Sequence, residues 1–224
     1  CGCIFVRSSL FSTAHHYTLN PIPMVINWYG EACFKIQSGE FVLMTDPFES
    51  STGLTPPRFK ASLTLRTRIE KPLPYRHEDT PTIEGPGEYE VAGNQVTGVH
   101  LPASPKEILT AYTVFLEDMK IGLLGHATEM PAPDALELLA GSDILIVPAG
   151  GTPFLAIEGV AKIVKQVNPK IVIPSLFKIS GLTRKAGDIK AFLDELGQKP
   201  DAEEKFVTKK KDLPTGMQVK VLRI

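Results

Sequence analysis

Two stretches near the start of the chain decide the fold: WYGEACFKI at residues 28–36 and TDPF at residues 45–48. Apolar and aromatic residues dominate the first stretch, and Ser38-Gly39-Glu40 after it is typical of a turn between strands. A second apolar run at residues 41–45 ends at Asp46-Pro47, because proline has no N–H to donate to a sheet. The chain is therefore predicted to open as a β-hairpin.

The rest of the chain changes character at about residue 124. Before that point, short apolar runs are separated by turn residues such as Gly93-Asn94 and Glu117-Asp118, a pattern typical of a β-meander. After it, apolar strand runs alternate with helical patterns at residues 133–140, 157–167 and 188–196. Paired strands inside and helices outside predict a layered α/β sandwich.

Length and composition favour one folded domain. With 224 residues, 43% of them hydrophobic, the chain is long enough to bury one sizeable core, and we expect a single domain at residues 24–224. Residues 1–23 carry no secretory signal pattern and are expected to be an unstructured extension, with Met24 as a candidate true start. The longest apolar runs are too short to span a membrane, so we expect a soluble protein.

Charge and cysteine content exclude some function classes. The 24 basic and 25 acidic residues give a net charge of −1, which provides no global field for nucleic acid or an anionic membrane. The run Lys209-Lys210-Lys211 is interpreted as a solvated turn. Cys1, Cys3 and Cys33 form an odd set without paired spacing, so we expect no structural disulfide and a reducing, cytoplasmic location.

The two opening stretches resemble the start of the metallo-β-lactamase-fold hydrolases, especially the small branch that includes the ascorbate-phosphate lactonase-like proteins. The resemblance covers roughly residues 25–182. Further matches follow in order, at Gly85-Pro86-Gly87-Glu88-Tyr89-Glu90, Leu123-Leu124-Gly125, residues 143–148 with Gly150-Gly151, and residues 171–174. The resemblance implies an α/β fold, the four-layer αββα sandwich of this family.

The resemblance also implies a metal site, which the family builds from an H-x-H-x-D-H motif after a buried strand to hold zinc or another divalent metal. The corresponding stretch here is TRIEKPL at residues 67–73. Arg68 and Glu70 stand at the first two histidine positions, Pro72 at the aspartate and Leu73 at the last histidine. A shift of one or two residues restores nothing, because no histidine lies between His16 and His77.

The other ligand positions implied by the family are replaced as well. Glu31 stands for a histidine in the opening turn, His126 for an aspartate, and Leu176 for a histidine. Asp46 persists at its family position. We therefore predict no cofactor, no bound metal and no assignable catalytic residue, and a vestigial site formed by Glu31, Asp46, Arg68, Glu70, His126 and Leu176.

Two interpretations of this vestigial site are open. In one, Arg68 and Glu70 form an ion pair that replaces the metal as a local crosslink. In the other, Glu31, Asp46, Glu70 and His126, with Glu129 as a further candidate, cluster as an acid, a base or a weak metal site. His77 and His100 are expected in solvent-facing loops.

Two hypotheses for function follow. The first is a family member without metal or catalysis, retained as a binding or interaction module for a small molecule or protein partner. The alternative is a metal-dependent hydrolase of phosphodiesters or lactones with a rebuilt site. A role as subunit of an active paralogue is allowed by the fold, and the oligomeric state does not follow from the sequence.

Overall fold

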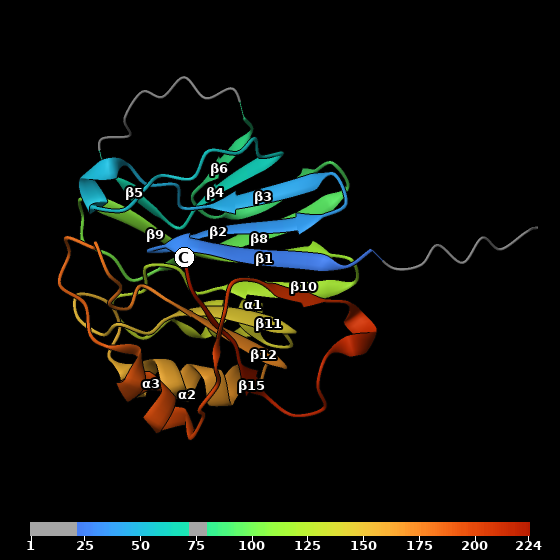
Figure 1. Cartoon of the computed structure of the whole chain (residues 1–224). Coiled ribbons are helices and arrows are strands. Elements are labelled where there is room, and N and C mark those ends of the chain that lie inside the picture. The colour runs from blue at the N-terminus through green and yellow to red at the C-terminus, as the bar shows by residue number, and fades with distance from the viewer. Residues whose placement is uncertain (1–21, 72–79) are drawn as a thin grey trace, which may run out of the picture.

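Two β-sheets face each other across one core in the computed structural model, which describes residues 22–71 and 80–224 (Figure 1). The predictions made for residues 1–21, Pro72, Leu73 and His77 lie outside the described residues. The six-stranded sheet has the order β14-β1-β2-β3-β4-β6. Its strands are β1 (Met24–Gly30), β2 (Cys33–Ser38), β3 (Phe41–Thr45), β4 (Leu63–Arg66), β6 (Thr82–Glu84) and β14 (Phe206–Thr208).

The eight-stranded sheet follows the order β15-β12-β11-β10-β9-β8-β7, with β5 paired to β9 beside this path. A hairpin joins β9 to β10 through Glu117 and Asp118, both left-handed with φ of 49° and 60°, as a tight β-turn requires. The strands of this sheet are β5 (Arg68–Glu70), β7 (Gly87–Val91), β8 (Asn94–Leu101), β9 (Glu107–Leu116), β10 (Met119–Leu123), β11 (Ile144–Pro148), β12 (Ile171–Ser175) and β15 (Gln218–Val219). A small third sheet pairs β13 (Ala202–Glu203) with β16 (Val221–Leu222).

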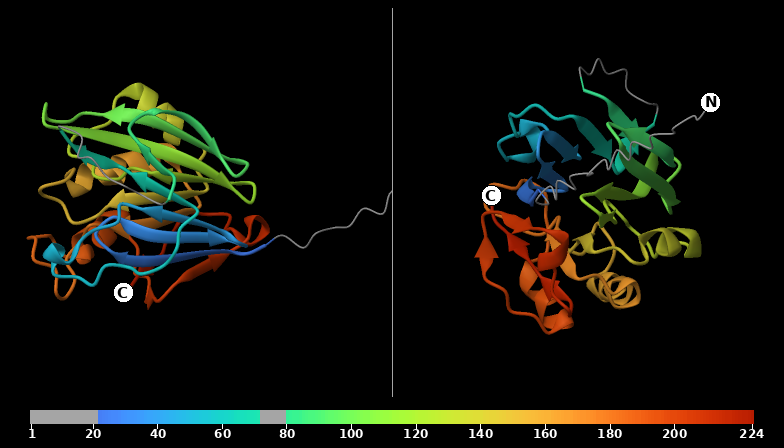
Figure 2. Two further views of the ribbon diagram at one scale, coloured as in Figure 1. Left: turned by 90° about the horizontal axis from the view of Figure 1, so that it is seen from above. Right: turned by 90° about the vertical axis from the view of Figure 1, so that its right-hand side faces the viewer.

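The α-helices lie on the outer side of the eight-stranded sheet (Figure 2). They are α1 (Pro133–Leu139), which contacts β8 and β9, α2 (Ile157–Val167), which contacts β11, and α3 (Ile189–Leu196), which packs on α2. Loops and the 3-10 turns η1 (Ser50–Thr52) and η2 (Lys210–Asp212) complete the described chain. No helix in the described ranges has both the length and the apolar character needed to cross a membrane.

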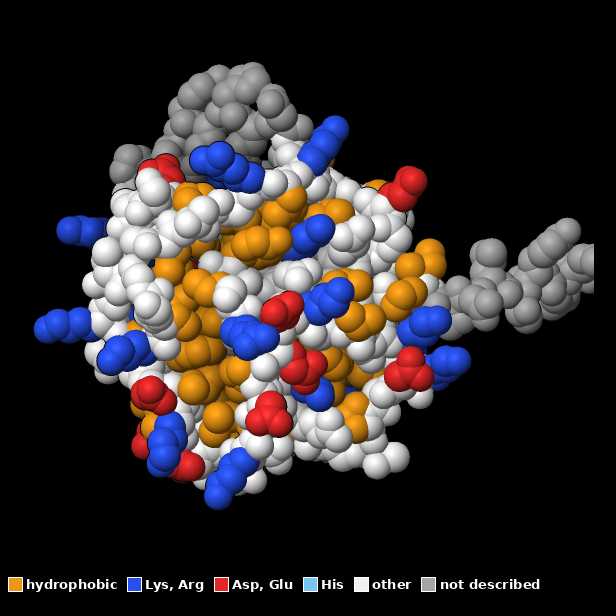
Figure 3. All heavy atoms as spheres, in the orientation of Figure 1, with side chains coloured by type: hydrophobic (Ala, Val, Ile, Leu, Met, Phe, Trp, Pro, Cys, Tyr) orange, Lys and Arg blue, Asp and Glu red, His pale blue; other side chains and the backbone are white. Residues whose placement is uncertain are grey.

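The outer face of the six-stranded sheet is turned toward the viewer in Figures 1 and 3. Figure 3 shows hydrophobic side chains over this face, interspersed with charges of both signs. Tyr29 on this side packs against Phe59 of the loop between β3 and β4, with tilted rings whose centroids are 5.4 Å apart, and the Lys35 ammonium lies 5.3 Å from the centroid of the Phe59 ring. The loop thus covers part of the sheet with an aromatic and cation–π contact.

Most predicted elements are confirmed. The opening hairpin, the turn at Glu117-Asp118 and the three predicted helices are present, and the α/β class is correct. One local prediction is wrong: His100 is exposed as expected but lies in β8, paired with Thr110, and not in a loop. Strand β8 runs up to Leu101 and ends directly before Pro102, so the proline limits the strand without excluding His100 from it.

Burial on α3 generates a prediction about stability. Phe192 is fully buried, whereas Phe115 on β9 is 44% exposed. We expect Phe192→Ala to lower the free energy of unfolding by about 3–5 kcal/mol, because the substitution leaves a cavity. Phe115→Ala is the matched control, with an expected loss below about 1 kcal/mol. Urea denaturation measures both, and equal losses would contradict the assignment of α3 to the core.

Candidate functional site

A pocket of about 470 Å³ opens where the loops at one end of the two sheets meet. The β1–β2 turn, the segment after β3, strand β5 and the loops after β10, β11 and β12 all contribute to its wall. Its lining consists of Glu31, Ala32, Asp46, Pro47, Phe48, Ser51, Thr52, Arg66, Arg68, Glu70, His126, Phe154, Thr183 and Arg184. Five of the six residues predicted for the vestigial site therefore line one pocket.

The sixth residue, Leu176, lies beneath the pocket. It is fully buried in a small apolar cluster with Ala32 and Phe154, and its backbone carbonyl accepts a hydrogen bond of 3.0 Å from Arg184 Nη2. A leucine at this place supplies packing to the pocket floor and no ligand atom.

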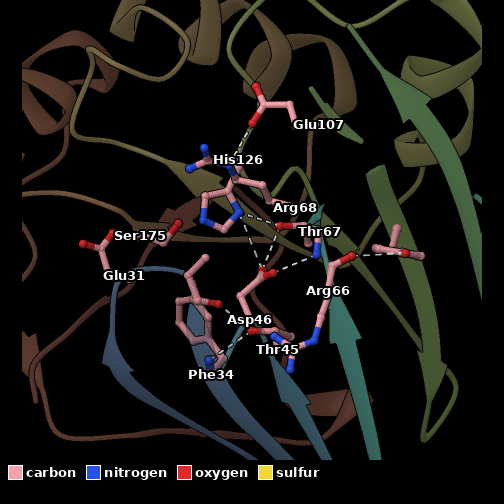
Figure 4. A network of polar contacts seen from close by, with 12 residues as sticks. Glu31, Phe34, Thr45, Asp46, Arg66, Thr67, Arg68, Glu107, His126 and Ser175 are labelled. Carbon is pink, nitrogen blue, oxygen red and sulfur yellow. Dashed lines mark hydrogen bonds and ion pairs between the residues drawn. The ribbon is translucent and has the colours of Figure 1, made fainter. Parts of the chain in front are cut away.

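A hydrogen-bonded chain runs from Asp46 to His126 through Thr67 (Figure 4). Asp46 Oδ1 accepts from the Thr67 backbone amide at 2.7 Å, and its Oδ2 lies 2.8 Å from Thr67 Oγ1. The same hydroxyl lies 2.8 Å from His126 Nδ1. Thr67 therefore sits between the carboxyl group and the imidazole, which are themselves 3.9 Å apart.

Burial shifts the ionisation of both ends of this chain. It raises the pKa of Asp46 to about 7, although hydrogen bonds from Thr67 act in the opposite direction. Burial, followed by the charges of Arg68 and Arg184, lowers the pKa of His126 to about 3. The imidazole is therefore neutral near pH 7, with Nδ1 directed at Thr67 and Nε2 away from it.

A bidentate ion pair between Glu31 and Arg184 closes one side of the pocket. Arg184 Nε donates to Glu31 Oε1 at 3.1 Å and Nη2 donates to Oε2 at 2.8 Å. The guanidinium also stacks over the Phe154 ring, 5.0 Å from its centroid. Because the side chains of Glu31 and Arg184 are only 13% and 23% exposed, solvent screens this pair less than a surface pair.

The backbone around the pocket is unusual. Glu31, Asp46 and Leu176 all have left-handed φ, at 49°, 38° and 60°, a region that non-glycine residues rarely adopt. Gly125 is also left-handed, and a Cβ there would lie 2.4 Å from Thr67 Cβ. Such conformations persist only where surrounding contacts hold them, and they gather at binding and catalytic sites.

The predicted pair of Arg68 with Glu70 is wrong. Arg68 Nε instead donates to Glu107 Oε2 on β9 at 2.9 Å. Glu70 is paired directly with Glu107 in the β5–β9 register. Arg68 lies two residues from Glu70 on the same face of the sheet, so its guanidinium is diagonally across from Glu107. Cross-strand neighbours are within reach of such long side chains, which explains the observed partner.

The predicted cluster of Glu31, Asp46, Glu70 and His126 does line a common pocket, whereas Glu129 is exposed outside its lining. The residues that sequence reasoning missed are Thr67, Phe154 and Arg184. Thr67 is the first residue of the TRIEKPL stretch, whereas Arg184 lies beyond the part of the sequence that resembles the family and carries no local signal.

The donor atoms present do not fit a divalent metal. Both Asp46 oxygens are engaged by Thr67, His126 Nδ1 is engaged by the same residue, and both Glu31 oxygens accept from Arg184. A guanidinium beside the site repels a cation. Within residues 22–71 and 80–224, no three His, Cys, Asp or Glu side chains are grouped to hold a metal ion.

Comparison with known proteins places the chain in a family. The β-lactamase superfamily domain matches residues 25–175. The chain belongs to this superfamily. Its fold is that of the metallo-β-lactamase-fold hydrolases, as solved structures of that kind show. No match was found among curated proteins.

Three solved structures illustrate the shared fold. A protein from Thermotoga maritima, assigned to Zn-dependent hydrolases of the metallo-β-lactamase superfamily, is 24% identical with a TM-score of 0.71, over 89% of this chain and 98% of that one. Igni18, a metallo hydrolase from Ignicoccus hospitalis, is 13% identical with a TM-score of 0.62, over 89% and 94% of the two chains. The metallo-β-lactamase fold protein YhfI from Bacillus subtilis is 10% identical with a TM-score of 0.58, over 89% and 96%.

The shifted pKa values of Asp46 and His126 predict opposing effects of pH on stability. Between pH 3.8 and about 7, folded Asp46 keeps a proton that the unfolded chain has released, so its contribution to the free energy of unfolding falls as pH rises. Between about pH 3 and 6.5, unfolded His126 holds a proton that the folded protein lacks, so its contribution rises with pH.

Two variants separate these contributions. We expect Asp46→Asn to make the free energy of unfolding rise more steeply with pH than in the parent between pH 3.8 and 6.5. We expect His126→Gln to make it fall more steeply over the same range. Urea denaturation across that range measures both slopes, and two variants with the parental slope would refute the assigned pKa shifts.

The Glu31–Arg184 pair predicts a measurable coupling energy. In a double-mutant cycle with Glu31→Gln and Arg184→Gln we expect about 1–3 kcal/mol, because the pair is bidentate and largely buried. Lys190 and Asp194, 80% and 54% exposed, form the control pair. There the expected coupling is about 0.3–0.5 kcal/mol. Equal couplings in the two cycles would show that the pocket pair is no stronger than a surface pair.

Proposed function

We propose that this chain is a non-catalytic member of the metallo-β-lactamase-fold family whose pocket serves as a binding site. The observation that carries the proposal is the Glu31–Arg184 pair, which uses a position matching a family metal ligand to bind a guanidinium. A cation fixed to the protein crosslinks the loops without offering the exchangeable coordination sites that activate water.

Pocket geometry supports retention of a binding role. Left-handed backbone at Glu31, Asp46 and Leu176 is costly, at about 1–3 kcal/mol per residue, yet the loops keep it. Charged side chains and the aromatic rings of Phe48 and Phe154 line the pocket together. Concave sites with an apolar wall and a few convergent polar groups are typical of small-molecule binding.

A hydrolase with a rebuilt site is the second candidate, and one arrangement favours it. His126 lines the pocket, and its Nδ1 is held by Thr67 against Asp46, so Nε2 is oriented as the imidazole of an acid or base would be. The low pKa of His126 opposes this role, because a base that protonates only near pH 3 is weak at neutral pH.

Metal content and hydrolysis test the proposal. We expect protein purified without chelators to contain well below about 1 equivalent of zinc, manganese or iron, because the oxygens of Asp46 and Glu31 are engaged and the described residues group no three ligand side chains. We also expect no turnover of bis-p-nitrophenyl phosphate or of simple lactones, with or without added metal. Elemental analysis by mass spectrometry and absorbance assays measure the two quantities.

Two outcomes would favour the hydrolase instead. One is about one or two equivalents of bound metal that survive dialysis. The other is turnover that His126→Ala abolishes and His100→Ala, an exposed histidine on β8, leaves unchanged.

A further inference from the structure

We propose that an extended peptide from a partner protein binds in a groove along the open edge of β1, with an acidic side chain facing Arg58. The groove has a volume of about 1100 Å³ and shares no lining residue with the pocket around His126. The inference goes beyond the proposed function, because it concerns a second surface and a macromolecular partner. It stands whether or not the pocket binds a metal or a small molecule.

The groove lies beside the end of β1 near which the C-terminus is marked in Figure 1. The loop between β3 and β4 forms one of its walls, and segments after β13 and β16 form another. Figure 3, in the same orientation, shows hydrophobic side chains around this place. The residues used below are Trp28 and Tyr29 of β1, Pro56 and Arg58 of the loop, and Glu204 and Arg223 of the second wall.

Strand β1 has a strand partner along only part of its groove side. On the other side it pairs with β2 along its whole length, but β14 pairs only with Met24, Val25 and Ile26. Glu204 lines the groove two residues before β14 begins, so the groove lies on the β14 side. Among the described residues, no strand therefore pairs with residues 27–30 on this side.

The backbone of Trp28 points at this open edge. In an antiparallel sheet, residue pairs that exchange both N–H···O bonds alternate with pairs that exchange none. The Phe34 amide donates to Thr45 Oγ1 on β3, so Trp28 and Phe34, which are opposite each other in the β1–β2 register, form a pair of the second kind. The Trp28 N–H and C=O therefore face the groove, and no backbone group within residues 22–71 and 80–224 bonds to them there.

An unpaired strand edge inside a groove fits an extended peptide. Free N–H and C=O groups on such an edge form ladder hydrogen bonds with an added strand, which supply affinity, while side-chain contacts supply specificity. A second copy of the chain fits less well, because the edge is recessed between two walls and a copy presents the same recess. A single peptide strand enters such a recess without displacing its walls.

The charges on the groove walls select the side chain that the peptide carries. Arg58 is exposed on the wall, and no ion pair or hydrogen bond engages it in the described part of the chain. Arg223, by contrast, pairs with Glu204 at 3.1 Å. The charge left unpaired is therefore positive, which favours an acidic residue in the partner. Tyr29 and Pro56 supply apolar contact for the residues beside it.

A fluorescence titration of the full chain tests the inference, because Trp28 is the only tryptophan of the sequence and lines the groove. The probe is a terminally blocked heptapeptide of alternating valine and glutamate, and we expect saturable binding with a Kd below about 1 mM. The same peptide with N-methylated backbone amides should not bind, since it cannot donate ladder hydrogen bonds. A valine–lysine peptide should bind at least about fivefold more weakly, because its charge has the sign of Arg58.

The variant Arg58→Gln isolates the effect of the charge. We expect it to weaken binding of the valine–glutamate peptide by about two- to fivefold, the range for an exposed ion pair. Lys162→Gln, which removes an exposed cation of α2 outside the groove lining, is the matched control and should bind as the parent does. Thermal melts of both variants show that they are folded, so a loss of affinity is not a loss of structure.

Hydrogen exchange locates the bound peptide. The Trp28 amide should exchange more slowly in the complex, because the peptide accepts its hydrogen bond. The amides of β7, the edge strand of the eight-stranded sheet, should exchange at the same rate with and without peptide.

Five results would overturn the inference. The first three are no fluorescence change up to about 5 mM valine–glutamate peptide, equal binding of the N-methylated peptide, and equal affinities of Arg58→Gln and Lys162→Gln for the acidic peptide. The fourth is slowed exchange in β7 in place of Trp28. The fifth is a dimer of the free chain that the peptide dissociates in sedimentation velocity, which would assign the edge to a second copy.

Discussion

The ion pair between Glu31 and Arg184 is the contact on which the pocket depends. It joins residues 153 positions apart in the sequence, one in the tight turn between β1 and β2 and one in the loop after β12. These loops belong to different sheets, so the pair ties the two halves of the sandwich together at their open end. Leu176 strengthens the tie, because its amide donates to the Glu31 carbonyl and its carbonyl accepts from Arg184.

A metal in this family makes the same kind of connection between loops, but it leaves a position for water or substrate. Here the connecting charge is a side chain, and its hydrogen bonds are nearly all satisfied within the protein. A second connection runs from Asp46 after β3, through Thr67 between β4 and β5, to His126 after β10. In the described residues these hydrogen bonds and ion pairs connect the loops around the pocket.

Local elements could be predicted because their causes are local. The β1–β2 hairpin follows from apolar runs around a turn, and α2 follows from apolar residues at helical spacing ended by left-handed Asn168. The resemblance to the family predicts that Arg68, Glu70, His126 and Leu176 replace metal ligands, and three of the four line one pocket. Side-chain pairing does not follow from the sequence in this way: the nearest acidic residue along the strand is Glu70, but Arg68 pairs across the sheet with Glu107.

The sequence by itself determined the α/β class and the order of strands and helices, and its resemblance to the family predicted which residues replace the metal ligands. Those properties depend on periodicity, turn chemistry and side-chain type, all of which are written along the chain. Only the tertiary structure decided that Arg184 meets Glu31 and that Thr67 stands between Asp46 and His126. Such contacts join distant segments, and their geometry depends on how two sheets pack and where their loops converge, which no local pattern encodes.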